Sequence, residues 1–65
     1  MEVLTWKARI EKNLTLKQLE ALTGIGKTTL NNIENGLTSP TLQQMELIAA
    51  ALDTRISNLY ESDYK

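Results

Sequence analysis

The fold is decided by residues 14–36, which read LTLKQLEALTGIGKTTLNNIENG. The start of this stretch predicts a helix with a capping box, because the side chains of Thr15 and Gln18 can each accept a hydrogen bond from the backbone amide of the other residue. Gly24 follows about two turns later, where a glycine in the left-handed conformation commonly ends a helix. The first half of the stretch therefore predicts a short, well-capped helix.

The second half predicts another short helix, opened by Gly26 and closed by Gly36. Leu30 and Ile33 share its apolar face. The opposite face collects small hydrogen-bonding side chains, which are those of Thr28, Asn31, Asn32 and Asn35. Thr and Asn are poor helix formers, so the residues of this face indicate a role other than helix stability.

Further helical segments are predicted on either side of this pair. They are a helix at 3–12, a helix at 41–52, a helical turn at 56–60 and a frayed tail at about 61–65. The helix at 41–52 begins with a second capping box, Thr41 with Gln44. Its apolar stripe consists of Leu42, Met45, Ile48, Ala49 and Leu52. No segment shows the alternation of a strand, so the chain predicts a single all-α domain over residues 1–65 with five short helices.

Composition narrows the class of function. A chain of 65 residues and 7.3 kDa forms one domain with a small core. It contains no Cys and no His, so it lacks thiolate and imidazole metal ligands and the usual catalytic base. The longest apolar run, Leu47–Leu52, is far too short to span a membrane, and the first residues lack the basic start of a signal peptide. We expect a cytoplasmic domain that is not an enzyme and has no cofactor, metal or small-molecule site.

Charge is unevenly distributed, although the formal net charge is only −1. Between Lys7 and Lys27, five cations accompany two carboxylates, whereas the rest of the chain is acidic. One interpretation is ordinary surface scatter, and the other is a positive end that meets a polyanion. The segment GIGKTT at 24–29 is not a phosphate loop, because Ala21 stands where that motif requires a glycine and a helix precedes it instead of a strand.

Two short helices joined by a tight turn, the second with a polar outer face, form the pattern of a helix-turn-helix. The chain resembles the Cro and lambda-repressor class of these domains, the XRE family, over about residues 4–60. The resemblance is carried by Leu19, Gly24, Ile25, Leu30, Ile33, Glu34, Asn35 and Gly36, and then by Ser39, Pro40, Ile48, Ala49 and Leu52. It implies a compact five-helix domain with its helix-turn-helix at about residues 16–35.

The resemblance also implies roles for individual residues. Base contacts would come from Thr28, Asn31 and Asn32, with Lys27 able to reach a guanine. Phosphate contacts would come from Lys17, Lys27, Asn35 and Thr38, and Thr29 stands where family members reach a phosphate or a neighbouring base. Arg9 and Glu34 occupy positions at which many members have a buried ion pair between the first and third helices.

Three positions depart from the pattern of this class. Leu16 replaces a Gln that commonly reaches a phosphate, so one backbone contact is expected to be lost unless Lys17 supplies it. Glu20 stands where a small residue usually packs between the two helices. Gly26 replaces the usual Ser cap, which predicts a looser start for the second helix of the motif.

The sequence is compatible with two functions from different classes. The resemblance implies a sequence-specific DNA-binding transcriptional regulator, a repressor of phage, mobile-element or small bacterial type, which binds a double-stranded operator as a homodimer. The candidate dimer surface consists of Ile56, Leu59, Tyr60 and Tyr64. The alternative is a protein-interaction module on the same fold, an antitoxin-like or anti-repressor partner, which the sequence pI of about 5.2 and the residue at position 16 favour.

Overall fold

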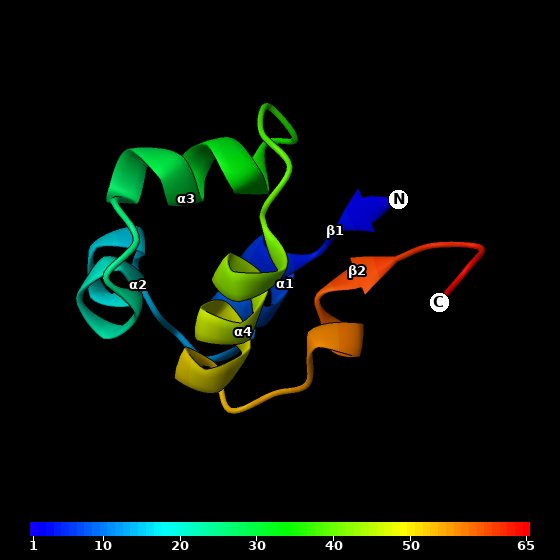
Figure 1. The fold of residues 1–65 in the computed structure, drawn as a ribbon. Helices are drawn as coiled ribbons and strands as arrows, with labels where there is room; N and C mark the ends of the chain where they lie inside the picture. Colours follow the sequence, from blue (N-terminus) through cyan, green and yellow to red (C-terminus); the bar gives the residue numbers. More distant parts are fainter.

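Four α-helices, a 3₁₀ turn and a two-stranded sheet make up the fold in a computed structural model that describes residues 1–65 (Figure 1). In chain order the elements are β1 (Glu2–Val3), α1 (Thr5–Glu11), α2 (Leu16–Thr23), α3 (Lys27–Glu34), α4 (Leu42–Ala51), η1 (Ile56–Asn58) and β2 (Tyr60–Glu61). Figure 1 shows α3 along one edge of the molecule, with both chain ends on the side away from α2. None of the helices combines the length and the apolar character that crossing a membrane requires.

Both predicted capping boxes are confirmed. At the start of α2, Gln18 N donates to Thr15 Oγ1 over 3.1 Å and Thr15 N donates to Gln18 Oε1 over 2.8 Å. At the start of α4, Thr41 and Gln44 exchange the same two bonds over 3.1 and 2.9 Å. Gly24 ends α2 with φ +75°, a conformation that L side chains rarely adopt. These local signals fix where the two helices begin and where α2 turns into α3.

The core is aliphatic and lies between α2, α3, α4 and the segment after α4. Its buried hydrophobic residues are Leu19, Ile25, Leu30, Ile33, Met45, Ile48, Ala49, Leu52 and Leu59. Leu42, which the helical spacing assigned to an apolar stripe, is instead 76% exposed, and Leu22 of α2 is also exposed, at 59%. Leu42 is the first residue of α4, one turn before Met45, and it extends past the edge of the core.

The helix predicted at 3–12 starts later, at Thr5, because the residues before it pair with the end of the chain. β1 and β2 are antiparallel, with Val3 opposite Tyr60. The prediction of a helical turn through Tyr60 and a frayed tail from Glu61 was therefore wrong at these two residues, which form β2. A strand of two residues is too short to show an alternating pattern, so only long-range pairing reveals it. The domain has four α-helices and a 3₁₀ turn in place of five helices.

Replacing a buried aliphatic side chain should destabilise so small a core strongly. Ile48 is completely buried, so Ile48→Ala should lower the free energy of unfolding by about 2–5 kcal/mol through lost burial and a residual cavity. Leu42→Ala, in the same helix, should change it by less than about 0.5 kcal/mol because the leucine is exposed. Urea unfolding of both variants measures the difference. Similar values for the two would contradict this placement of the core.

Candidate nucleic-acid interface

Arg9 joins three parts of the fold. Its Nε donates to Glu34 Oε2 over 2.6 Å and its Nη2 donates to Glu34 Oε1 over 3.0 Å, which makes a two-bond pair between α1 and the last residue of α3. Its Nη1 donates to the backbone carbonyl of Leu14 over 2.7 Å, in the loop before α2. The Arg9 and Glu34 side chains are 15% and 9% exposed. The hydrogen bond with Glu34 raises the pKa of Arg9, although burial acts in the opposite direction.

The turn between α2 and α3 is held by the hydroxyl of Thr23. Thr23 Oγ1 donates to the carbonyl of Leu19 over 2.8 Å and accepts from the amide of Ile25 over 3.1 Å. All three residues are buried, so the turn is tied both to the preceding helix and to the core. This hydroxyl and the left-handed Gly24 set the direction in which α3 leaves α2.

The start of α3 has an unusual cap. Gly26 is the N-cap residue and has no side chain to accept a hydrogen bond. The carboxylate of Glu20 on α2 takes that place, because its Oε2 accepts from the Lys27 amide over 2.7 Å. The sequence predicted a loose helix start and changed packing at these positions, but did not reveal that Glu20 compensates for Gly26. The available signal was the coincidence of a missing cap hydroxyl and an acidic residue on the preceding helix.

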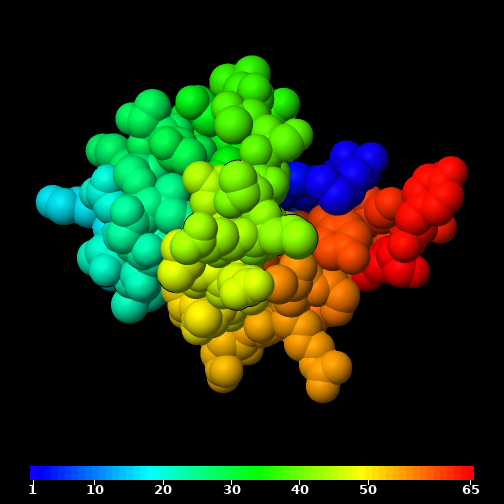
Figure 2. Space-filling model, in the orientation of Figure 1, coloured from blue at the N-terminus to red at the C-terminus, as the bar shows by residue number.

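The outer face of α3 presents the polar residues that the sequence singled out. Leu30 and Ile33 bury the inner face. On the outer face Lys27, Thr28, Asn31 and Asn35 are exposed and Asn32 is half-buried. Thr29 is also half-buried and lies one turn before Ile33, at the boundary of the buried face. In the space-filling view, α3 and the loop after it form the upper surface of the face that is shown (Figure 2).

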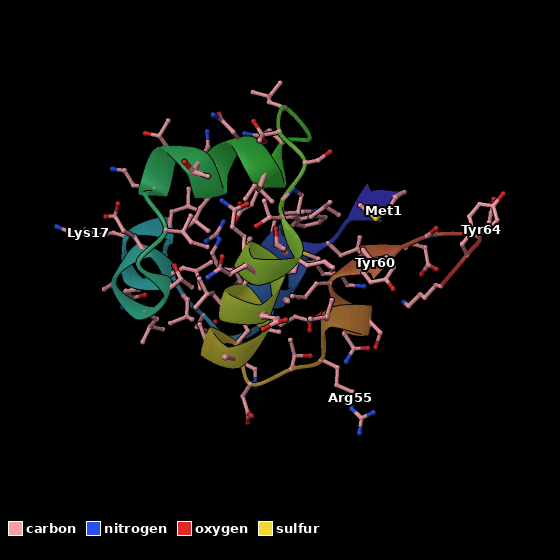
Figure 3. All side chains as sticks on the ribbon, viewed as in Figure 1. Met1, Lys17, Arg55, Tyr60 and Tyr64 are labelled. Carbon is pink, nitrogen blue, oxygen red and sulfur yellow. The ribbon has the colours of Figure 1, made fainter.

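The flanking candidates lie on either side of this face. Thr38 is exposed in the loop that follows α3, and Lys17 is exposed near the start of α2. Figure 3 shows Lys17 projecting sideways from α2, below α3, whereas Arg55 projects from the bottom of the molecule. Lys27, Thr28, Thr29, Asn31 and Asn32 thus lie on α3 and Asn35 at its end, whereas Thr38 lies in the next loop and Lys17 on α2.

The candidate dimer surface needs one correction. Leu59 is 0% exposed and completes the core, so it has no surface to offer a second copy. Tyr64 is 97% exposed on the C-terminal tail, away from the body of the domain (Figure 3). Ile56 and Tyr60 line an apolar hollow of about 290 Å³. Its other lining residues are Met1, Pro40, Leu42 and Met45. Leu42, which the sequence assigned to the core, is the most prominent apolar side chain of α4 at this hollow.

Glu34→Ala should reveal how much the Arg9 pair stabilises the domain. The substitution leaves a mostly buried guanidinium without its counter-charge, so the free energy of unfolding should fall by about 3 kcal/mol. Glu61→Ala is the matched control, because the exposed Glu61–Lys65 pair, 3.8 Å apart, should contribute less than about 0.5 kcal/mol. Urea unfolding compares the two, and an equally small loss in both would show that the Arg9 pair is not a structural element.

Known proteins provide an independent comparison. A family model described as helix-turn-helix matches residues 7–59. No curated protein matches the chain. Among solved structures, a complex of the SinR and SinI proteins has a chain that matches with a TM-score of 0.82 and 30% sequence identity, over 92% of this chain and 59% of that one. The N-terminal DNA-binding domain of SinR from Bacillus subtilis matches with a TM-score of 0.81 and 29% identity, over 94% of this chain and 90% of that domain.

These matches cover the region in which the residues themselves predicted the fold. The chain spans 59% of the matched chain in the SinR–SinI complex, so it corresponds to one part of that protein. The family match extends from α1 through η1 and includes both helices of the motif. The resemblance to the Cro and lambda-repressor class is confirmed, and the chain belongs to the helix-turn-helix family.

Proposed function

We propose that this domain is a sequence-specific DNA-binding transcriptional regulator, a repressor of phage, mobile-element or small bacterial type that acts in the cytoplasm. The observation that carries the proposal is the outer face of α3, which is polar, exposed and built from side chains that match base edges. The inner face of the same helix is fixed by Leu30 and Ile33 in the core. A helix held in this way can enter a major groove as a rigid unit.

Phosphate contacts would set the position of α3 on the duplex. Lys17 and Lys27 supply positive charge, and Asn35 and Thr38 supply neutral hydrogen-bond donors at the other end of the helix. All four side chains are exposed around α3. Such contacts carry no sequence information, but they make binding depend strongly on salt.

Base readout would favour A·T pairs. An Asn amide can pair with N6 and N7 of adenine, and a Thr methyl group packs against the methyl group of thymine. α3 offers Thr28, Asn31 and Asn32 for these contacts and contains no Arg. The bidentate contact from Arg to guanine is therefore unavailable from this helix, and Lys27 remains as the side chain that can reach one G·C pair.

A homodimer would place two copies of α3 on half-sites about 34 Å apart, one turn of DNA. The hollow lined by Leu42, Ile56 and Tyr60 is the surface that we assign to this contact, and Tyr64 lies outside the hollow, on the tail. Figure 2 shows the start of α4 beside the segment that follows this helix, and side chains from both line the hollow. A symmetric contact of this kind requires only one self-complementary patch.

A protein-interaction module on the same fold is the second candidate. The net charge of −1 and Leu16 at a position where the class commonly has Gln favour it, and one similar structure is a complex between two proteins, SinR and SinI. A gel shift with random-sequence duplex DNA across a salt series separates the two functions. Affinity that falls steeply with salt supports DNA binding, whereas no binding at low salt supports the protein partner.

Asn32→Ala and Lys17→Ala should weaken DNA binding in different ways. On sites selected from a random DNA pool, Asn32→Ala should cost about 1–3 kcal/mol and remove the preference at one base pair, because it deletes a base contact. Lys17→Ala should weaken binding evenly across sequences and reduce the salt slope by about one. Competition with single-base-substituted duplexes measures both effects. If Asn32→Ala keeps the full sequence preference, α3 does not read bases as we propose.

Leu42→Lys should weaken self-association without affecting folding. Placing a charge in the apolar hollow should raise the dimer dissociation constant about tenfold or more, as expected for the loss of a central apolar contact. Leu22→Lys is the control, because Leu22 is also an exposed helical leucine but does not line this hollow. Sedimentation equilibrium of both variants tests the assignment, and equal dimer strength in the two would place the interface elsewhere.

A further inference from the structure

We propose that Glu20 is a positioning residue that also opposes DNA binding: its carboxylate caps α3 and, at the same time, lowers the affinity of the domain for DNA of any sequence. The inference rests on the proposed DNA-binding function. Glu20 lies on α2, yet its Oε2 accepts a hydrogen bond from Lys27 N, the first amide of α3, over 2.7 Å. It therefore places a negative charge at the end of α3 that also carries Lys27 and Thr28.

The capping part of this role follows from the missing side chain at Gly26. The first amides of a helix have no partner within the helix, and a hydroxyl or carboxylate normally satisfies one of them. α3 has no acidic residue in its first turn and no side-chain cap from Gly26. Glu20 supplies both the acceptor and the negative charge that favours a helix N-terminus.

The effect on DNA follows from the position of the same charge. Exposed amides at a helix N-terminus attract phosphate groups, but here the carboxylate already holds the Lys27 amide. A phosphate near this end of α3 would also be repelled by Glu20, and the repulsion acts on every DNA sequence. Base contacts from Thr28, Asn31 and Asn32 would then account for a larger share of the affinity for a specific site. Glu20 thus lowers the affinity for specific and non-specific DNA alike.

Three variants separate the cap from the charge. Glu20→Gln keeps a side-chain oxygen that can accept from the Lys27 amide but removes the charge. Glu20→Ala removes both the oxygen and the charge. The double variant Glu20→Ala with Gly26→Ser restores a cap from the usual position, and there is room for it, because a Cβ at Gly26 would meet only Glu20 Oε2, at 4.0 Å.

Asp53→Asn is the control for net charge. It removes one negative charge in the turn after α4, at the end of the molecule opposite α3 (Figure 1). Asp53 has φ +50°, a left-handed conformation that Asn also tolerates, so the fold should be unaffected. Glu20→Gln and Asp53→Asn have the same net charge and differ in where the charge was lost.

Thermal unfolding tests the cap. Glu20→Ala should lower the melting temperature by about 4–8 °C, the shift expected for a lost helix cap in a domain of this size. Glu20→Gln keeps the acceptor and loses only the charge, so its melting temperature should fall by less than that of Glu20→Ala, and the double variant should recover most of the loss. An unchanged melting temperature in Glu20→Ala would overturn the capping role.

Binding to a random-sequence DNA duplex tests the charge. At low salt, Glu20→Gln should bind about three- to tenfold more tightly than the parent protein, and the gain should shrink as salt screens the repulsion. The affinity of Asp53→Asn for the same duplex should increase by less than twofold. If Glu20→Gln gains no more affinity for DNA than Asp53→Asn does, the charge of Glu20 does not oppose DNA binding. That result would overturn the inference and leave the proposed function intact. If the parent protein shows no salt-dependent binding to DNA, the proposed function is wrong, and the inference that rests on it is wrong as well.

Discussion

The two-bond pair between Arg9 and Glu34 is the interaction on which the position of α3 depends. The sequence of α3 is rich in Thr and Asn, so this helix cannot rely on its intrinsic propensity. Two buried side chains, Leu30 and Ile33, hold its inner face, but burial does not fix rotation and tilt by itself. Arg9 adds a directional constraint at the last residue of the helix, and its third bond, to the carbonyl of Leu14, ties the loop before α2 to the same guanidinium.

A carboxylate acts at each end of α3, and the two ends differ electrostatically. Glu20 lies at the N-terminus, where the helix dipole favours a negative charge. Glu34 lies at the C-terminus, where the dipole disfavours it. The guanidinium of Arg9 neutralises this second carboxylate, which makes an acidic residue acceptable at that end. The residues that hold the two ends of α3 lie on other helices, Glu20 on α2 and Arg9 on α1. The position of α3 therefore depends on the rest of the domain.

Local signals predicted much of this fold, and long-range contacts account for what was missed. The capping boxes at Thr15 and Thr41 and the stop at Gly24 each involve neighbours along the chain, so spacing alone reveals them. The pairing of β1 with β2 joins the two ends of the chain and leaves no periodic pattern. Helical spacing also could not tell that Leu42 lies beyond the edge of the core while Leu59 lies within it. Among the candidate DNA contacts, the sequence assigned Thr28, Asn31, Asn32 and Asn35 to one polar face, of which only Asn32 is half-buried.

An acidic net charge does not prevent a domain of this kind from approaching DNA, because the positions of individual charges matter more than their sum. The molecule extends 31 Å along its longest axis, whereas salt screens exposed charges over about 8–10 Å. The acidic residues of the C-terminal segment lie at the far side of the molecule from the start of α3 (Figure 1). Glu34 is paired with Arg9 and contributes little field at the surface. Under the proposed function, a phosphate near the start of α3 would be attracted by Lys17 and Lys27 and repelled by Glu20.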